Sequence, residues 1–201
     1  MNSLKTITYQ RAIGFFRAKK AIDIYSKITN NSYQFRDILG GNQHWCDFDN
    51  GVQWGEYTSI FQNGDEAKHI SQQLYHIDIQ KLTEDYQIQV DVKSIPPQGK
   101  PEIRSYSVNT IEEIENAARK KIQKYYPHRE NNFSSKGILL IGIVDPVFGG
   151  FGGDAEVTEY ALGKIAQNLR SFIDQRCFEK IVIIDELARL ENTDRAFYSL
   201  I

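Results

Sequence analysis

The chain has 201 residues, of which 41% are hydrophobic and 25% are charged, a composition typical of a globular protein rather than of a disordered or coiled-coil one. Its formal net charge of −2 excludes a global attraction to nucleic acid or to an anionic membrane, so a polyanionic partner would have to be bound by a local basic patch. The two cysteines, Cys46 and Cys177, lack the spacing of a zinc site and are expected to be buried, reduced thiols.

The sequence predicts a cytoplasmic protein. No charged and then apolar leader opens the chain. The longest apolar run, GILLIGIV at 137–144, is too short to span a bilayer. We therefore expect no membrane association.

The N-terminal part of the chain begins with a helical pattern. Apolar side chains recur at helical spacing over residues 9–28, which predicts an amphipathic helix. Residues 30–63 are rich in Asn, Gly and aromatic side chains, and Asn50-Gly51 is typical of a hairpin turn. We interpret residues 1–63 as an N-terminal helix and an irregular, aromatic-rich extension packed on a core formed by residues 64–201.

The remainder of the chain alternates helical and strand patterns. The predicted elements are a helix at 65–74, strands at 75–82 and 86–95 joined by a short turn as an antiparallel hairpin, a further strand at 102–108, a helix at 110–126, a strand at 138–144, a helix at 156–176 and a strand at 180–185. The last two strands are continuously apolar, as is typical of strands covered on both faces. This order predicts an α/β sandwich around a mixed sheet.

Charged side chains share the polar faces of the two hairpin strands. Because side chains alternate along a strand, Asp91 and Lys93 point the same way. Asp78 lies on the polar face of the first strand, between Ile77 and Ile79. If the apolar faces match across the pair, the polar faces match too, so Asp78, Asp91 and Lys93 are expected to converge.

Two carboxylates and a lysine suit metal-assisted hydrolysis of a phosphodiester. Asp78 and Asp91 would hold one or two Mg²⁺ ions, which contact the substrate phosphate and lower the pKa of a bound water. Lys93 would orient that water or stabilise the negative charge that develops on the phosphorane oxygens. The alternative is an exposed hairpin face whose charges are solvated and paired across strands.

The pattern resembles that of the PD-(D/E)xK nucleases, the restriction endonuclease-like superfamily, in which an acid on one strand precedes Asp/Glu-x-Lys on the next. Here Asp78 is followed, after a gap of 12 residues, by Asp91-Val92-Lys93. The resemblance implies a restriction endonuclease-like three-layer sandwich with a core of helix, three-stranded meander, helix and strand. It also implies a Mg²⁺-dependent endonuclease that acts on DNA as a homodimer, and an upstream glutamate that contacts metal, with Glu66 as first candidate and Glu56 as second.

A basic segment could supply the DNA contacts. Between residues 93 and 136, nine Lys or Arg residues outnumber five acidic ones. The helix at 110–126 contributes Arg119, Lys120, Lys121 and Lys124, which would approach the phosphate backbone. The alternative is a solvated helix face, which is what charge runs usually form.

A glycine-rich loop at Gly149–Gly153 favours a different function. Gly150-x-Gly152-x-x-Ala155 matches a dinucleotide-binding pattern, and Asp185 ends the next strand, where a ribose-binding acid would fall. The chain would then be a non-catalytic or nucleotide- or S-adenosylmethionine-binding α/β module. Against this, four residues separate the strand from the glycines, and acidic side chains at the helix start would repel a phosphate. A flexible surface loop is the remaining interpretation.

Overall fold

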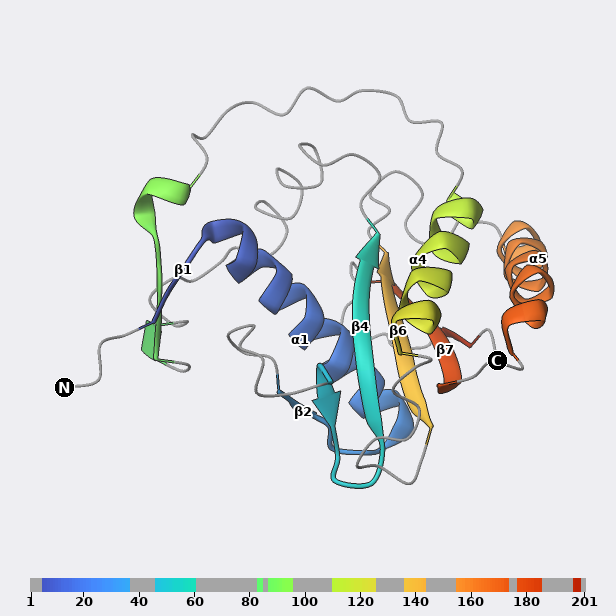
Figure 1. The fold of residues 1–201 in the computed structure, drawn as a ribbon, viewed down its shortest axis with the longest axis horizontal. Coiled ribbons are helices and arrows are strands. Elements are labelled where there is room, and N and C mark those ends of the chain that lie inside the picture. Colours follow the sequence, from blue (N-terminus) through green and yellow to red (C-terminus); the bar gives the residue numbers. More distant parts are fainter. Residues whose placement is uncertain are drawn as a thin grey trace.

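The computed structural model describes residues 5–36, 46–60, 83–84, 87–95, 110–125, 136–143, 155–173, 177–185 and 197–199. These residues form a mixed α/β architecture (Figure 1). Its helices are α1 (Tyr9–Thr29), α4 (Thr110–Tyr125) and α5 (Ala155–Ile173), with a short 3₁₀ helix η1 (Val92–Ser94). Its strands are β1 (Lys5–Ile7), β2 (Gln34–Phe35), β3 (Phe48–Asp49), β4 (Trp54–Ile60), β5 (Ile88–Val90), β6 (Gly137–Ile143), β7 (Phe178–Asp185) and β8 (Phe197–Ser199).

Six of the strands form one mixed sheet in the order β2-β3-β4-β6-β7-β8. β3 runs antiparallel to both β2 and β4, and the turn between β3 and β4 contains Gly51 with a positive φ of 84°. The predicted hairpin at Asn50-Gly51 is therefore confirmed. β4, β6 and β7 are parallel, and β8 returns antiparallel to β7.

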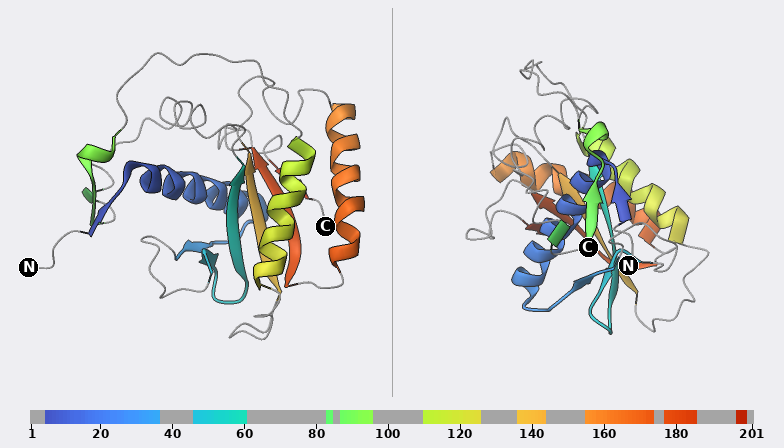
Figure 2. Two further views of the ribbon diagram at one scale, coloured as in Figure 1. Left: turned by 45° about the horizontal axis from the view of Figure 1, so that its top comes forward. Right: turned by 90° about the vertical axis from the view of Figure 1, so that its left-hand side faces the viewer.

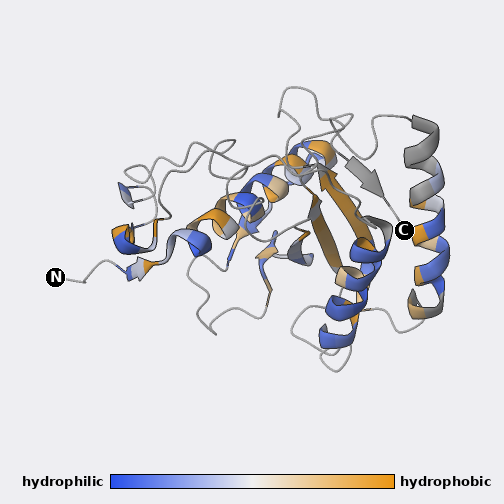
Figure 3. Ribbon diagram, turned by 90° about the horizontal axis from the view of Figure 1, so that it is seen from above, coloured by the Kyte–Doolittle hydropathy of each residue, from blue (hydrophilic) through white to orange (hydrophobic). Residues whose placement is uncertain are grey.

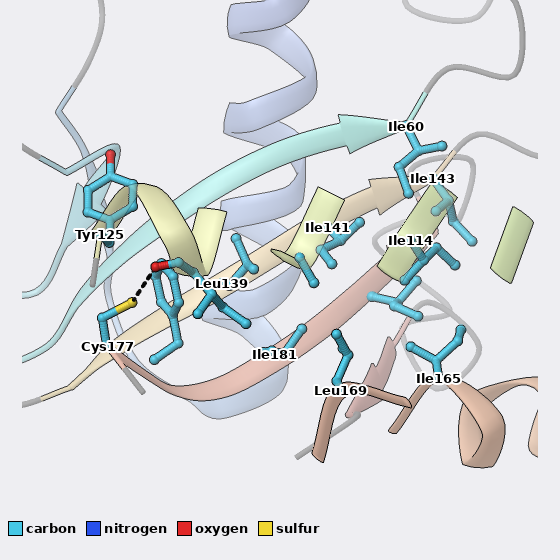
Figure 4. Close-up of a cluster of buried hydrophobic side chains, with 14 of the residues drawn as sticks. Ile60, Ile114, Tyr125, Leu139, Ile141, Ile143, Ile165, Leu169, Cys177 and Ile181 are labelled. Carbon is cyan, nitrogen blue, oxygen red and sulfur yellow. Dashed lines mark hydrogen bonds between the residues drawn. The ribbon is translucent and has the colours of Figure 1, made fainter. Parts of the chain in front are cut away.

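Helices cover both faces of this sheet, giving three layers (Figure 2). On one face, α1 packs on a cluster that includes Ile138, Leu140 and Val182. On the other face, α4 and α5 pack on alternate residues of the same strands, including Leu139 and Ile141 (Figure 4). Every residue of β6 is buried, as expected of a continuously apolar strand covered on both sides. The predicted α/β architecture around a mixed sheet is confirmed.

A second, smaller cluster lies at the N-terminal end of α1, away from the six-stranded sheet (Figure 1). There β1 and β5 form a parallel pair in the register Lys5 with Ile88 and Ile7 with Val90. Buried side chains of both strands pack on Ala12 and Phe15 of α1. The 21-residue helix α1 thus joins two clusters, since its C-terminal half packs on the main sheet.

Apolar residues concentrate in the sheet, whereas α4 and α5 also carry hydrophilic stretches (Figure 3). Within the described ranges, none of the helices combines the length and the hydropathy needed to cross a bilayer.

The strand predicted at 86–95 is shorter than expected, because β5 ends at Val90, and β5 pairs with β1. The segment at 75–82, expected beside it, and the strand expected at 102–108 lie outside the described residues. The division expected between residues 63 and 64 falls after β4, which ends at Ile60 and pairs with β6 in the six-stranded sheet.

Candidate functional site

Asp91 and Lys93 lie in one tight turn after β5. The Asp91 side chain caps η1, and its Oδ1 accepts a hydrogen bond of 3.0 Å from the backbone nitrogen of Lys93. Aspartate often competes with strand pairing in this way, by bonding a backbone donor two residues on. The two residues are therefore held together through a side-chain-to-backbone bond rather than on the polar face of a strand. Asp78 and Glu66 lie outside the described residues.

The same turn is attached to the start of α1. The Asp91 backbone nitrogen donates to the Ile7 carbonyl at 2.8 Å. The Ser94 hydroxyl donates to the Asp91 carbonyl and accepts from the Tyr9 nitrogen, both at 2.7 Å. These bonds satisfy backbone groups at a helix start, so the turn has a clear structural role.

The basic residues predicted on α4 separate into inward and outward ones. Arg119 lies 3.9 Å above the Phe172 ring of α5 and donates to the Asn168 carbonyl at 3.3 Å. Arg119 therefore contributes to the contact between α4 and α5. Lys120 and Lys124 are exposed and are accessible to a polyanion.

Lys121, the remaining predicted basic residue, meets a buried acid of β4. Its Nζ lies 2.7 Å from Oε2 of Glu56, whose side chain is only 2% exposed, while that of Lys121 is 20% exposed. Glu56 shares its strand face with Trp54 and Ile60, which belong to the apolar cluster beneath α4. A carboxylate in such a layer must be paired, because an isolated buried charge costs many kcal/mol.

The position of Lys121 follows from the periodicity of α4. The helix buries one stripe against the sheet, formed by Ile114, Ala118, Ile122 and Tyr125 (Figure 4). Lys121 flanks this stripe, so its methylene chain runs along apolar surface while its ammonium reaches Glu56. The sheet and the helix thus each contribute one charge to a single contact.

A second carboxylate, that of Asp47, is bonded to the backbone of β4. β3 and β4 pair with Phe48 opposite Gly55 and Asp49 opposite Trp54, and Asp47 precedes this pairing. The Asp47 nitrogen donates to the Gly55 carbonyl at 3.0 Å. Its Oδ2 accepts from the Tyr57 nitrogen at 2.8 Å, so the carboxylate is held against the backbone of β4.

Acidic neighbours contribute to the raised pKa values of the Tyr125 hydroxyl and the Cys46 thiol. Burial raises the pKa of the Tyr125 hydroxyl, and a hydrogen bond to Glu56 and the charges of Glu56 and Asp47 raise it further. Burial raises the pKa of the Cys46 thiol to about 12, with contributions from Asp49, Glu56 and Asp47. The cation that meets the Glu56 charge is the Lys121 ammonium, 2.7 Å away.

Asp49, the other acid of this hairpin, is already neutralised. Its carboxylate accepts from Nε of Arg36 at 2.6 Å and from a second guanidinium nitrogen at 3.1 Å. It also accepts from the Gly51 nitrogen at 2.9 Å, which supports the turn. We therefore define the Glu56 site as Asp47, Glu56, Lys121 and Tyr125.

The acids of the Glu56 site are carboxylates, the ligand type that hard divalent cations prefer. Among the described residues, no group of three or more His, Cys, Asp or Glu side chains gathers around a common metal position. Two carboxylates suffice for Mg²⁺, which usually keeps several waters and takes further oxygen ligands from substrate phosphate. Asp47 and Glu56 offer such oxygens, and sulfur or imidazole ligands are not required.

The sequence contains part of the signal for this site. Alternation in WGEYTSI places Glu56 on the face of Trp54 and Ile60, and a charged residue at a core position is rarely buried without a partner. From the sequence, Glu56 is only the second candidate for an upstream acid, and Lys121 is predicted only as a DNA contact. Their pairing joins residues 65 positions apart, which no local pattern predicts.

Comparison of the chain with protein-family models, with curated proteins and with solved structures gives no match. Its function is therefore inferred from the side chains that the fold brings together.

Proposed function

We propose that the chain is a Mg²⁺-dependent endonuclease that hydrolyses DNA phosphodiester bonds at the Glu56 site. The observation that carries the proposal is the 2.7 Å ion pair between the buried Glu56 and Lys121. Asp47, whose Oδ2 accepts from the Tyr57 nitrogen of the same strand, is the second acid of the proposal. Two acids and one lysine are the set that the sequence predicted for Asp78, Asp91 and Lys93. Here the set comes from β4, α4 and the residue that precedes β3.

The order of the elements supports a restriction endonuclease-like assignment. In the chain, α1 is followed by the antiparallel meander β2-β3-β4, then by β5, η1 and α4, and then by β6, which is parallel to β4. The resemblance implies a core of helix, three-stranded meander, helix and strand, and β5 and η1 are additional to that order. It also implies Asp/Glu-x-Lys on one strand, whereas Glu56 is followed by Tyr57 and Thr58, so that Lys121 of α4 would have to supply the lysine.

Each side chain of the site has a role in this chemistry. Asp47 and Glu56 would hold the Mg²⁺ ion, which would supply Lewis acidity toward the phosphate and lower the pKa of a bound water. Lys121 balances the charge of Glu56 and, being partly exposed, can turn toward the scissile phosphate and offset its developing negative charge. Lys120 and Lys124, exposed on the same helix, would bind neighbouring backbone phosphates.

The trio from the sequence, Asp78, Asp91 and Lys93 with Glu66, is an alternative placement of the same chemistry. It is favoured by the proximity of Asp91 and Lys93 in one turn. The two placements predict loss of activity in different variants, because the Asp91 turn lies beside the N-terminal end of α1 and the Glu56 site lies between β4 and α4.

A nucleotide- or S-adenosylmethionine-binding module is the second candidate function. β6 and β7 are parallel neighbours, and α5 lies between them in the chain. Nucleotide-binding folds use this strand–helix–strand unit and bind their ligand at the first turn. The glycine loop at 149–153 falls at that turn, outside the described residues.

Nicking of supercoiled plasmid tests the proposal. We expect nicking that requires Mg²⁺ and that Glu56→Gln and Asp47→Asn reduce to the level of a metal-free control. Glu179→Gln is a matched control, because Glu179 accepts a hydrogen bond of 2.6 Å from Gln53 in a different part of the protein. We expect that variant to retain activity.

Three other outcomes would contradict the proposal. Loss of nicking in Asp91→Asn but not in Glu56→Gln would place the site at the Asp91 turn. Absence of nicking together with a thermal shift on adding a nucleotide or S-adenosylmethionine would favour the second function. Activity that persists with a metal chelator would exclude Mg²⁺ dependence.

Light scattering would test the expected homodimer, which cleavage of both DNA strands favours.

A further inference from the structure

The helix α5 lies at the outer margin of the structure, beside α4 and on the side of the sheet opposite α1 (Figure 1 and Figure 2). Its inner side is fixed by packing, because Ile165 and Leu169 are buried in the apolar cluster beneath it. Its flank is bonded to α4, where Nδ2 of Asn168 donates to Oε1 of Glu115 at 2.6 Å. The opposite side of the helix is open to solvent.

That outer side carries an exposed aromatic ring beside a glycine. Tyr160 is 70% exposed. At Gly163, one turn further on, an added Cβ would meet no atom within 4 Å. Gln167 and Arg170 follow at spacings of four and three residues, and both are exposed. Spacings that alternate between four and three keep residues on one stripe of a helix, as in the seam of a coiled coil, and a glycine in the stripe lets a second helix approach closely.

The charges of α5 are divided along its axis. Glu156 and Glu159 belong to its first half, whereas Lys164 and Arg170 belong to its second half. The charges sum to zero, so the helix as a whole does not attract a polyanion. A second α5 that runs antiparallel to the first would place acidic halves against basic halves, whereas a parallel one would place like charges together.

We propose that the outer side of α5 is a dimer interface, on which α5 of a second copy packs antiparallel about a two-fold axis at Gly163. Positions 156 and 170 each lie seven residues from Gly163, so this axis brings Glu156 of either copy level with Arg170 of the other. A two-fold interface must be complementary to itself in this way. The inference follows from α5 alone and does not rest on the proposed function.

Sedimentation of the full chain over a range of concentrations tests the interface. We expect a monomer–dimer equilibrium, because one pair of helices forms an interface at the small end of the usual range. Tyr160→Ser should raise the dimer dissociation constant about 10-fold or more, as is typical when an aromatic side chain at the centre of an interface is removed. Val52→Ser is the matched control, because Val52 is 71% exposed in the turn between β3 and β4, and it should leave the equilibrium unchanged.

Charge reversal tests the antiparallel direction. Arg170→Glu places an acid level with Glu156 of the second copy, and we expect it to raise the dissociation constant about 10-fold. Adding Glu156→Arg to that variant should restore the dimer, because the two charges are then exchanged. A merely structural effect of either substitution would not be reversed by the other.

Cross-linking tests the position of the axis even if Tyr160→Ser does not fold. Under mild oxidation Gly163→Cys should form a disulfide between two copies, because the backbones are closest at the axis. Lys120→Cys, at an exposed position of α4, should not. Cys46 and Cys177 are buried and do not compete.

The inference is overturned by a chain that stays monomeric at every concentration, or by a dimer that Tyr160→Ser and Arg170→Glu leave intact. A monomeric protein that loses DNA affinity in Arg170→Glu would assign this side of α5 to DNA instead. Mg²⁺-dependent nicking by a monomer would overturn the interface and leave the proposed function standing. A dimer of the expected kind without nicking would do the reverse.

Discussion

Glu56 and Lys121 form an ion pair between the sheet and α4, with the carboxylate almost wholly buried and the ammonium partly open to water. Glu56 is buried more deeply than Lys121. Replacing Glu56 and replacing Lys121 should therefore lower the free energy of unfolding by different amounts. A buried carboxylate that loses its cation has no other strong compensation, whereas a flexible lysine that loses its anion can move its ammonium into solvent.

We expect Lys121→Met to lower the free energy of unfolding by about 3–5 kcal/mol, the usual cost of removing one partner from a buried pair. Glu56→Gln should cost less. Urea unfolding with an unchanged slope would measure both. Lys120→Met, at the adjacent exposed position, is the control and should change stability by less than about 0.5 kcal/mol. A greater loss in Glu56→Gln than in Lys121→Met would contradict the asymmetry.

Gly55 and Gly163 are expected to respond to alanine in opposite directions. A Cβ at Gly55 would overlap the ring of Phe48 on the paired strand β3, whereas a Cβ at Gly163 in α5 meets no atom within 4 Å. Gly55→Ala should destabilise the protein by about 1–3 kcal/mol, as overpacking does. Gly163→Ala should stabilise it by about 0.5–1 kcal/mol, because glycine is unfavourable inside a helix. Thermal unfolding of the two variants would test this, and a stabilised Gly55→Ala would show that the β3–β4 contact is looser than described.

The two thiols should be inert in the folded protein. Burial raises the pKa of Cys46 to about 12 and that of Cys177 to about 11, so almost no thiolate exists near pH 8. We expect a disulfide reagent to modify neither thiol until urea unfolds the chain. Rapid modification of the native protein at pH 8 would contradict the burial of these side chains.

The same shifts predict that stability falls at alkaline pH. An unfolded thiol ionises near pH 8.5, while the folded thiols stay protonated up to about pH 11 or 12, so the unfolded state binds fewer protons in this window. The free energy of unfolding must then decrease as pH rises above about 8.5. Cys177→Ala should make this decrease shallower. An equally steep decrease in the variant would assign the effect to other groups.

Local pattern predicted the long elements of the fold and missed the pairing between distant segments. The helix expected at 9–28 and the strand expected at 138–144 correspond to α1 and β6, because apolar side chains recur at helical spacing in the first segment and the second is an unbroken apolar run. The parallel pairing of β1 with β5 joins Lys5 to Ile88, and no short-range signal specifies such a contact. β5 is also shorter than its alternation indicates, because Asp91 uses its side chain to form a turn.

For the same reason, only part of the candidate site could be predicted from the sequence. Alternation places Glu56 on an apolar strand face, and helical periodicity places Lys121 beside the buried stripe of α4. Each observation indicates a charge next to the core. The identity of the partner depends on how α4 lies across β4, which is set by the packing of the whole layer and by the β4–β6 crossover.

Two substitutions of Asp91 distinguish a structural role of this residue from a catalytic one. Both asparagine and alanine remove the charge, but only alanine removes the cap. Asparagine caps a helical turn about as well as aspartate, so Asp91→Asn should keep the bond from the Lys93 nitrogen and nearly all of the stability. Asp91→Ala should cost about 1 kcal/mol through loss of the cap. With the site at Glu56, both variants should retain Mg²⁺-dependent nicking of plasmid when assayed well below their unfolding temperatures. A stable Asp91→Asn protein without activity would show that the charge itself is needed, since only a metal or substrate contact distinguishes a carboxylate from an amide of the same shape.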